Sequence, residues 1–222
     1  MTARGLFVTG TDTGVGKTRV AVALIHALRA EGLRVAAMKP VSAGSPPGGL
    51  NEDVAALLKA ANVAADVRDV NPYAFESAIA PHLAAAQAGV RIELAVIAAA
   101  YARLAARADA VVVEGAGGWR VPLNEREDMA DLAQQLALPV VLVVGLRLGC
   151  LNHAVLTVES IARRQVPWAG WVGNHIDPAM AQPATNLEAL RARLPGPCLG
   201  VQAFSSDPAF SADASSWLTL PR

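Results

Sequence analysis

The chain has 222 residues, of which 53% are hydrophobic, and its 19 basic and 19 acidic side chains cancel. This length favours a single α/β domain over residues 1–222 with one large core. The balanced charge gives no indication of a surface for nucleic acid or a membrane. Because no apolar run is long enough to span a membrane, no export signal begins the chain, and Cys150 and Cys198 lack metal-ligand spacing, we expect a cytoplasmic protein with reduced thiols.

Short Val-rich runs alternate with longer amphipathic stretches along the chain. The runs predict strands at residues 6–9, 34–38, 110–114, 140–144, 169–172 and 198–201. The stretches predict helices at residues 17–31, 52–61, 92–106, 129–136, 152–164 and 184–193. This alternation implies right-handed crossovers and a doubly wound, mainly parallel sheet flanked by helices. Ligands of such sheets gather at the carboxyl ends of the strands.

A glycine-rich loop, GTDTGVGKT at residues 10–18, follows the first strand and opens the first helix. The backbone N–H groups of such a loop and the helix N-terminus bind phosphate. Lys17 would reach the β- and γ-phosphates, and the Thr18 hydroxyl would ligate Mg²⁺. The spacing between Gly10 and Gly16 is one residue longer than the usual pattern. The loop predicts nucleoside triphosphate binding; the alternative is a surface lysine after a glycine-rich turn.

Three further charged residues lie where strands end or helices begin. Lys39, which Pro40 restricts to extended backbone, could stabilise negative charge on a transferred group. Glu114 ends a Val run and precedes glycines, which suits a carboxylate that holds Mg²⁺. Asp53 stands at a helix start, where the helix dipole alone explains an acid, and only the phosphate loop makes it a candidate metal ligand. The alternatives for Lys39 and Glu114 are a solvated loop lysine and a turn-capping carboxylate.

An ordered set of motifs resembles the dethiobiotin synthetase family over about residues 5–202. The motifs are GTDTGVGKT at 10–18, KPV at 39–41, NPY at 71–73, PH at 81–82, VEGAGGW at 113–119, LGCLNH at 148–153 and AGWVGN at 169–174. The extra residue in the phosphate loop is also a feature of that family. The resemblance implies the architecture of P-loop nucleoside triphosphate hydrolases.

The resemblance also implies a reaction. Its substrates would be 7,8-diaminononanoate, CO₂ and ATP as co-substrate, with Mg²⁺ as cofactor, and its products dethiobiotin, ADP and phosphate. A carbamate and a carbamic–phosphoric anhydride would be the intermediates. Lys39 and Lys17 would be catalytic, and Thr18, Asp53 and Glu114 would hold the metal. An amine nucleophile needs no strong general base, which agrees with the lack of a Ser-His-Asp or Cys-His grouping.

Two sets of binding residues follow from the same resemblance. ATP would be bound by Thr13, Gly14, Val15, Gly16, Lys17, Thr18, Arg19, Asp53, Glu114, Gly115, Ala116, Gly117, Asn174, His175, Ala203 and Phe204, with Asn174 reading the adenine. The diamine would be bound by Lys39, Ser42, Ala43, Gly149, Cys150, Leu151 and Asn152. The last four open a helix, whose free N–H groups suit the substrate carboxylate. Since the family holds that carboxylate across a dimer interface, we expect a homodimer and no nucleic-acid or membrane partner.

Three positions depart from the family pattern. Gly14 stands where the family often has Glu, which removes one contact near the phosphates. Ala43 aligns with a substrate-contacting serine, with Ser42 beside it. Ala203 aligns with a proline, and the resemblance fades from there to residue 222, a region that we expect to help enclose the base.

Two other classes of protein are the alternatives. A partition- or septum-site ATPase is a nucleotide switch with this fold and a related loop, but its loop usually carries an additional lysine where this chain reads Thr11-Asp12-Thr13. The C-terminus also lacks a basic amphipathic helix for a membrane. An amidating ligase of corrin synthesis also uses ATP to activate a carboxylate, but it normally carries a glutaminase domain for which this chain has no room.

Overall fold

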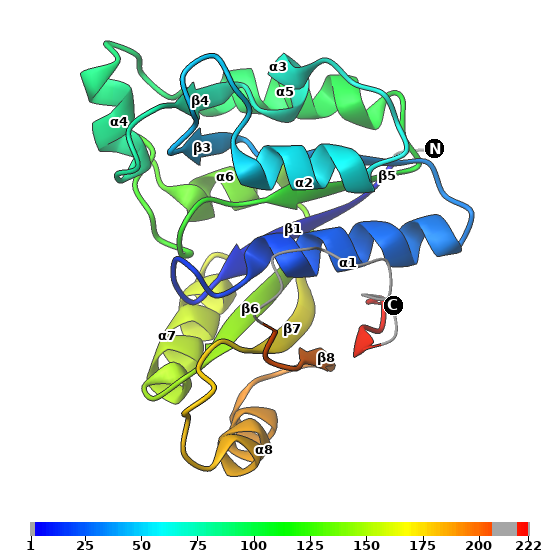
Figure 1. Ribbon diagram of the computed structural model, residues 1–222, viewed down its shortest axis with the longest axis vertical. Helices are drawn as coiled ribbons and strands as arrows, with labels where there is room; N and C mark the ends of the chain where they lie inside the picture. The colour runs from blue at the N-terminus through cyan, green and yellow to red at the C-terminus, as the bar shows by residue number, and fades with distance from the viewer. Residues whose placement is uncertain (1–2, 206–216, 222) are drawn as a thin grey trace.

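A six-stranded parallel sheet forms the centre of the molecule in the computed structural model, which describes residues 3–205 and 217–221 (Figure 1). The strand order is β2–β5–β1–β6–β7–β8. The strands are β1 (Arg4–Gly10), β2 (Val35–Met38), β5 (Ala110–Glu114), β6 (Val140–Leu146), β7 (Trp168–His175) and β8 (Cys198–Gln202). Two further short strands, β3 (Val41–Ala43) and β4 (Tyr73–Phe75), pair with each other in parallel.

Helices cover both faces of this sheet (Figure 1). On one face lie α1 (Lys17–Ala30) and α2 (Glu52–Ala60). On the other face lie α5 (Leu94–Ala105), α6 (Met129–Leu136) and α7 (Cys150–Arg163), with α8 (Pro183–Arg193) against α7. The short helices α3 (Val67–Val70) and α4 (Pro81–Gln87) lie near β3 and β4.

The strands are apolar on both faces because each face is covered. In β1, Leu6 and Val8 pack with α1, whereas Phe7 between them packs with α5 and α6. Successive side chains of a strand point to opposite faces, so a doubly covered strand reads as a continuous apolar run. This explains why Val-rich runs were sufficient to predict the six strands of the sheet, and the predicted doubly wound α/β class is confirmed.

The predicted elements are all present, with shifted ends. The helix predicted to begin at residue 152 begins at Cys150, because Gly149 adopts φ 94° and caps it. The helix predicted to begin at residue 92 begins at Leu94. Four further elements, β3, β4, α3 and α4, were not predicted; they have three to seven residues each. Such short elements contain too few periods for a hydrophobic pattern to identify them.

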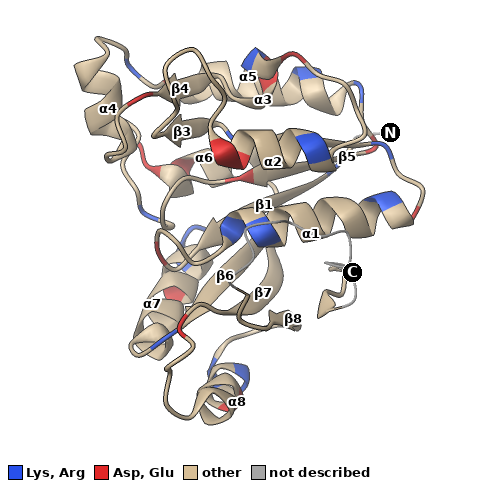
Figure 2. Cartoon of the chain, viewed as in Figure 1, with Lys and Arg blue, Asp and Glu red and all other residues tan. Residues whose placement is uncertain are grey.

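Residues of both charge signs are scattered over the helices and loops, as Figure 2 shows. The start of α1 is basic and the start of α2 is acidic, and both lie at the same end of the sheet (Figure 2). Among the residues described, no helix has both the length and the hydropathy of a membrane span.

Candidate active site

The loop between β1 and α1 has the geometry of a phosphate-binding loop. Gly16 caps α1 with φ 88°, and a Cβ at this position would lie 2.1 Å from Asn174 Nδ2, so only glycine fits. Lys17 and Thr18, the first residues of the helix, are buried. Lys17 Nζ donates a hydrogen bond to the Asp12 carbonyl oxygen at 2.9 Å, which turns the lysine back over the loop.

Four side chains from four elements meet beside this loop. Lys39 Nζ, after β2, lies 2.5 Å from Glu114 Oε1 at the end of β5 and 2.9 Å from Asp53 Oδ2 in the first turn of α2. The Thr18 hydroxyl in α1 lies 2.7 Å from Asp53 Oδ1 and 3.0 Å from Glu114 Oε1. Residues up to 96 positions apart in the chain are thereby brought together at the carboxyl ends of the strands, where ligands of such sheets bind.

Burial and neighbouring charges set the ionisation of this cluster. Burial alone would lower the pKa of Lys39, but the carboxylates of Glu114 and Asp53 outweigh it and the pKa is raised. Burial opposes ionisation of Asp53, yet Lys39 and the Thr18 hydroxyl hold its pKa below the ordinary value. Burial raises the pKa of Glu114, although Lys39 counteracts it. Burial and the nearby Lys39 charge lower the pKa of Lys17 to about 8. An anionic ligand would therefore favour the protonated Lys17.

The same residues fit a Mg²⁺ ion. Glu114 Oε2 is buried and has no hydrogen-bond partner among the described residues, so one carboxylate oxygen is left for a ligand. Asp53 and Thr18 offer further oxygens beside it. In the described residues no three His, Cys, Asp or Glu side chains form a metal-binding group. Mg²⁺ in phosphate sites needs only one or two carboxylates, since phosphate and water oxygens complete its coordination.

A cavity of about 490 Å³ opens next to Lys39. The predicted site residues that line it are Thr13, Lys39, Ser42, Ala43, Asp53, Ala116 and Gly117. Its remaining wall is largely apolar and includes Val41, Ile79, Pro81 and Val121. The cavity therefore places an ammonium group at one side of a space that suits an aliphatic chain.

Asn71 fixes the backbone at Lys39 through hydrogen bonds. This role was not predicted from the sequence. Asn71 Nδ2 donates to the Lys39 carbonyl oxygen at 2.7 Å and to that of Tyr73 at 3.1 Å. The Ser42 hydroxyl in turn donates to Asn71 Oδ1 at 2.8 Å. Ser42 is thus engaged with the protein, and its predicted contact with substrate stays a prediction.

A second cavity, of about 230 Å³, lies on the α1 side of the loop. Seven predicted nucleotide residues line it: Gly14, Gly16, Arg19, Asn174, His175, Ala203 and Phe204. Asn174 Nδ2 donates to the Val15 carbonyl oxygen at 2.8 Å and so ties β7 to the phosphate loop. Gly14 has φ 73°, a conformation in which the family's Glu would be strained, although its side chain would have space.

The predicted carboxylate-binding segment, Gly149, Cys150, Leu151 and Asn152, lies elsewhere. It forms the start of α7 and lines neither the Lys39 cavity nor the Asn174 cavity. Leu148, next to it, is 92% exposed. Arg147 at the end of β6 pairs with Asp12 of the phosphate loop at 2.5 Å and connects the two regions.

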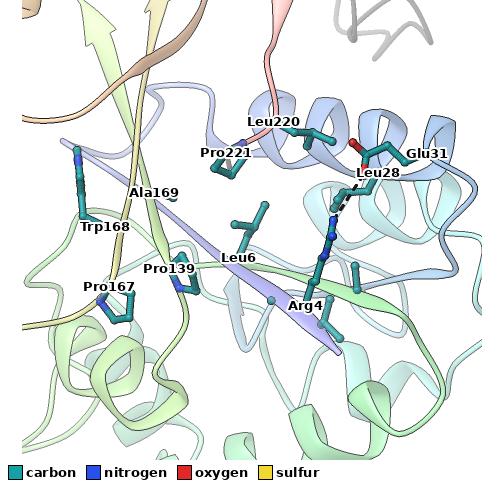
Figure 3. A pocket seen from close by; sticks show the side chains of 13 residues that line it. Arg4, Leu6, Leu28, Glu31, Pro139, Pro167, Trp168, Ala169, Leu220 and Pro221 are labelled. Atoms are coloured by element: carbon teal, nitrogen blue, oxygen red, sulfur yellow. Dashed lines mark ion pairs between the residues drawn. The ribbon is translucent and has the colours of Figure 1, made fainter. Parts of the chain in front are cut away.

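A third cavity, of about 600 Å³, lies at the amino ends of the strands (Figure 3). Its walls are mostly apolar, and the ion pair of Arg4 with Glu31, at 3.6 Å, lies at one side. None of the predicted site residues lines it. The predicted enclosure of the base by residues 203–222 concerns partly residues 206–216 and 222, which are outside the described ranges.

Comparison with known proteins finds similar sequences over the whole chain. A family model described as "AAA domain" matches residues 4–202. The chain is 52% identical to the "ATP-dependent dethiobiotin synthetase BioD" of Aromatoleum aromaticum, with 98% of each chain covered. It is 50% identical to the protein of the same name from Nitrosospira multiformis, covering 99% of this chain and 96% of that one. It is 54% identical to the one from Pseudomonas aeruginosa strain UCBPP-PA14, with 87% of each covered.

A solved structure is also similar in fold. The MinC:MinD cell division complex of Aquifex aeolicus contains a chain that matches with a TM-score of 0.57, covering 93% of this chain and 83% of that one. The two sequences are 16% identical, so this likeness concerns the fold alone.

Proposed function

The chain belongs to the family of ATP-dependent dethiobiotin synthetases, and we propose on that premise that it makes dethiobiotin from 7,8-diaminononanoate, CO₂ and ATP. The nucleotide-switch alternative is supported only by the likeness of fold to a cell division protein. Family membership therefore favours a ligase of small molecules over a switch that acts through protein partners.

Catalysis of this reaction depends more on stabilising charge and positioning the substrates than on proton transfer. One amine of the diamine adds to CO₂ and loses a proton, which gives a carbamate. A carbamate oxygen then attacks the γ-phosphorus of ATP in line, and ADP leaves. The second amine attacks the carbonyl carbon of the mixed anhydride, and phosphate leaves as the ring closes. Negative charge is concentrated on the carbamate and the transferred phosphoryl group throughout, so fixed cations are the most useful catalytic groups.

Lys39 and Lys17 are the cations that we propose for this role. Lys39 lines the cavity suited to the aliphatic diamine and is held by Glu114 and Asp53, which keep it protonated. From there it would neutralise the carbamate and the phosphoryl group that it attacks. Lys17 lies at the start of α1 beside the loop, from which it would bind the β- and γ-phosphates.

Thr18, Asp53 and Glu114 would hold Mg²⁺, because their oxygens converge beside the loop and Glu114 Oε2 has no other partner among the described residues. Bound there, the ion would neutralise phosphate charge as a Lewis acid. The observation that carries the proposal is the contact of Lys39 with both acids, since it joins the proposed nucleotide and diamine sites at one point.

We also propose a homodimer and a cytoplasmic location. The segment Gly149 to Asn152 lies outside the Lys39 cavity, so a second copy would have to bring its own segment to the diamine carboxylate. The free thiols of Cys150 and Cys198 suit a reducing compartment.

The test is whether ADP release requires the diamine and bicarbonate together. The purified protein is assayed with MgATP, and each small substrate is omitted in turn, while dethiobiotin labelled from ¹³C-bicarbonate is detected by mass spectrometry. We expect ADP and labelled product in equal amounts, and little of either when one substrate is missing. Equal ATP hydrolysis without the diamine would favour the nucleotide switch instead.

A further inference from the structure

Two amide side chains lie side by side at the end of the sheet beside the phosphate loop. Asn174 on β7 and Gln202 on β8 are register partners of two parallel strands. Register partners point to the same face of a sheet, on strands about 4.8 Å apart. Both residues line the Asn174 cavity, together with Gly14 and Gly16 of the loop.

The hydrogen bonds of the two amides differ. Asn174 donates its Nδ2 hydrogen to the Val15 carbonyl oxygen, so its own oxygen is the group left for a ligand. Gln202 Oε1 is shielded from solvent and has no hydrogen-bond partner among the described residues. A buried acceptor without a donor is costly, and in a native protein it calls for a specific explanation.

We propose that Gln202 is a specificity-determining residue that accepts a hydrogen bond from the exocyclic amino group of the nucleobase. The inference rests on the proposed function, because it takes the Asn174 cavity as the base site. An amino group has two N–H donors, which match the oxygens of Asn174 and Gln202. Both residues are uncharged amides, so their own contribution to base selection is made by hydrogen bonding.

The consequence is a preference for bases with an amino group at this edge. Adenine supplies two donors, whereas hypoxanthine has an oxygen at the same position and would face the amide oxygens with an acceptor. ATP and inosine triphosphate differ mainly at that position. Their comparison therefore isolates the proposed contact from the phosphates and the ribose.

The experiment is titration calorimetry of MgATP and Mg–inosine triphosphate with the intact protein and three variants. Gln202→Leu removes the acceptor at similar size, and Gln202→Glu keeps an acceptor oxygen but loses the N–H₂ group. Gln135→Leu makes the first change at an exposed site on α6. We expect the unmutated protein, Gln135→Leu and Gln202→Glu to prefer ATP by about tenfold, and Gln202→Leu to lose most of that preference.

Three results would overturn the proposal: no preference in the unmutated protein, an unchanged preference in Gln202→Leu, or a lost preference in Gln202→Glu. The last would mean that the amide donates instead of accepting. Since the readout is nucleotide binding, it is independent of dethiobiotin formation. Tight, selective binding without product would contradict the proposed function only, and product without base preference would contradict the role of Gln202 only.

Discussion

Lys39 is a buried cation that two acids hold in place. Its side chain is 5% exposed and contacts two carboxylates, one of which, Glu114, is fully buried. Removing one partner from a buried ion pair costs several kcal/mol, because the other charge stays behind without compensation. A useful substitution at this site must therefore keep a hydrogen-bond donor for Glu114 and Asp53 while it removes the charge.

Lys39→Gln meets that condition and should separate binding from chemistry. We expect the affinity for MgATP to change by less than about threefold, because Lys17 and the loop bind the phosphates. Dethiobiotin formation should fall by at least about a hundredfold, since one preorganised charge at a transferring group contributes about 3 kcal/mol. Calorimetry with MgATP and a product assay on the same sample measure both effects.

Lys59→Gln on α2 is the control, because Lys59 is exposed and lies in the helix that carries Asp53. Its rate should equal that of the unmutated protein. If Lys39→Gln makes dethiobiotin at the parental rate, Lys39 does not act on the transferred group.

The acids of the cluster give a second prediction at this scale. Asp53→Asn and Glu114→Gln should each raise the Mg²⁺ concentration for half-maximal activity by at least about tenfold, because each removes a proposed ligand. Initial rates are measured over a Mg²⁺ titration at saturating ATP. Glu52→Gln, an exposed acid next to Asp53, is the control and should titrate like the parent. If both site variants give the same Mg²⁺ titration curve as the unmutated protein, Asp53 and Glu114 have a structural role and do not bind the metal.

Strand ends were sufficient to predict which residues meet in the cluster, but not how they pair. Lys39 and Glu114 follow strands, and parallel strands end at one edge, so their proximity could be expected. The roles of Asn71 and Gln202 could not be predicted. The first depends on the path of two short, unpredicted strands, and the second on the register between β7 and β8.

At the scale of the element, α6 is the described helix whose N-terminus carries a full capping box. Asp128 accepts hydrogen bonds from the backbone N–H groups of Ala130 and Asp131, and Asp131 accepts one from the N–H of Asp128, which forms a capping box. Arg164, at the end of α7, pairs with Asp131. The contact therefore fixes the start of α6 against the end of α7.

Asp131 should make the stability of the protein sensitive to acid. Burial opposes its ionisation, but the Asp128 N–H and Arg164 lower its pKa below the ordinary value. A lowered pKa means that the unfolded chain binds the proton more tightly, so the stabilisation is present above about pH 4 and is lost as the pH falls further. Asp131→Asn should cost about 1 kcal/mol at pH 7 and flatten the fall in Tm below pH 4.

Thermal unfolding at pH 7 and pH 3 measures this difference. Glu188→Gln, an exposed acid on α8, is the control and should follow the parent at both values. A Tm difference between Asp131→Asn and the parent that is the same at pH 3 as at pH 7 would show that the carboxylate charge of Asp131 contributes nothing.

At the scale of the whole molecule, one face of α7 is left without cover. Asn152 and Leu156 lie four residues apart on α7 and are both exposed, Leu156 by 56%, whereas Leu148, which is 92% exposed, precedes the Gly149 cap. Residues four apart share one face of a helix. This face therefore carries the apolar Leu156 one turn from Asn152, which is proposed to bind the diamine carboxylate, and the exposed Leu148 lies just before the helix. Exposed apolar side chains beside a binding residue are expected of an interface that completes a site.

Leu156→Asp tests whether this face joins two copies. A carboxylate buried in an apolar contact should weaken the dimer by at least about thirtyfold, the effect of losing a strong interface residue. In sedimentation experiments the variant should be a monomer at concentrations where the parent is a dimer. MgATP affinity should be unchanged, because the two site cavities lie outside this face, whereas the KM for the diamine should rise.

Val96→Asp, an equivalent change at an exposed valine of α5, should leave both dimer and KM intact. A parent that sediments as a monomer, or a Leu156→Asp variant that stays dimeric with a normal KM, would remove α7 from the interface and leave the carboxylate to be bound within one chain.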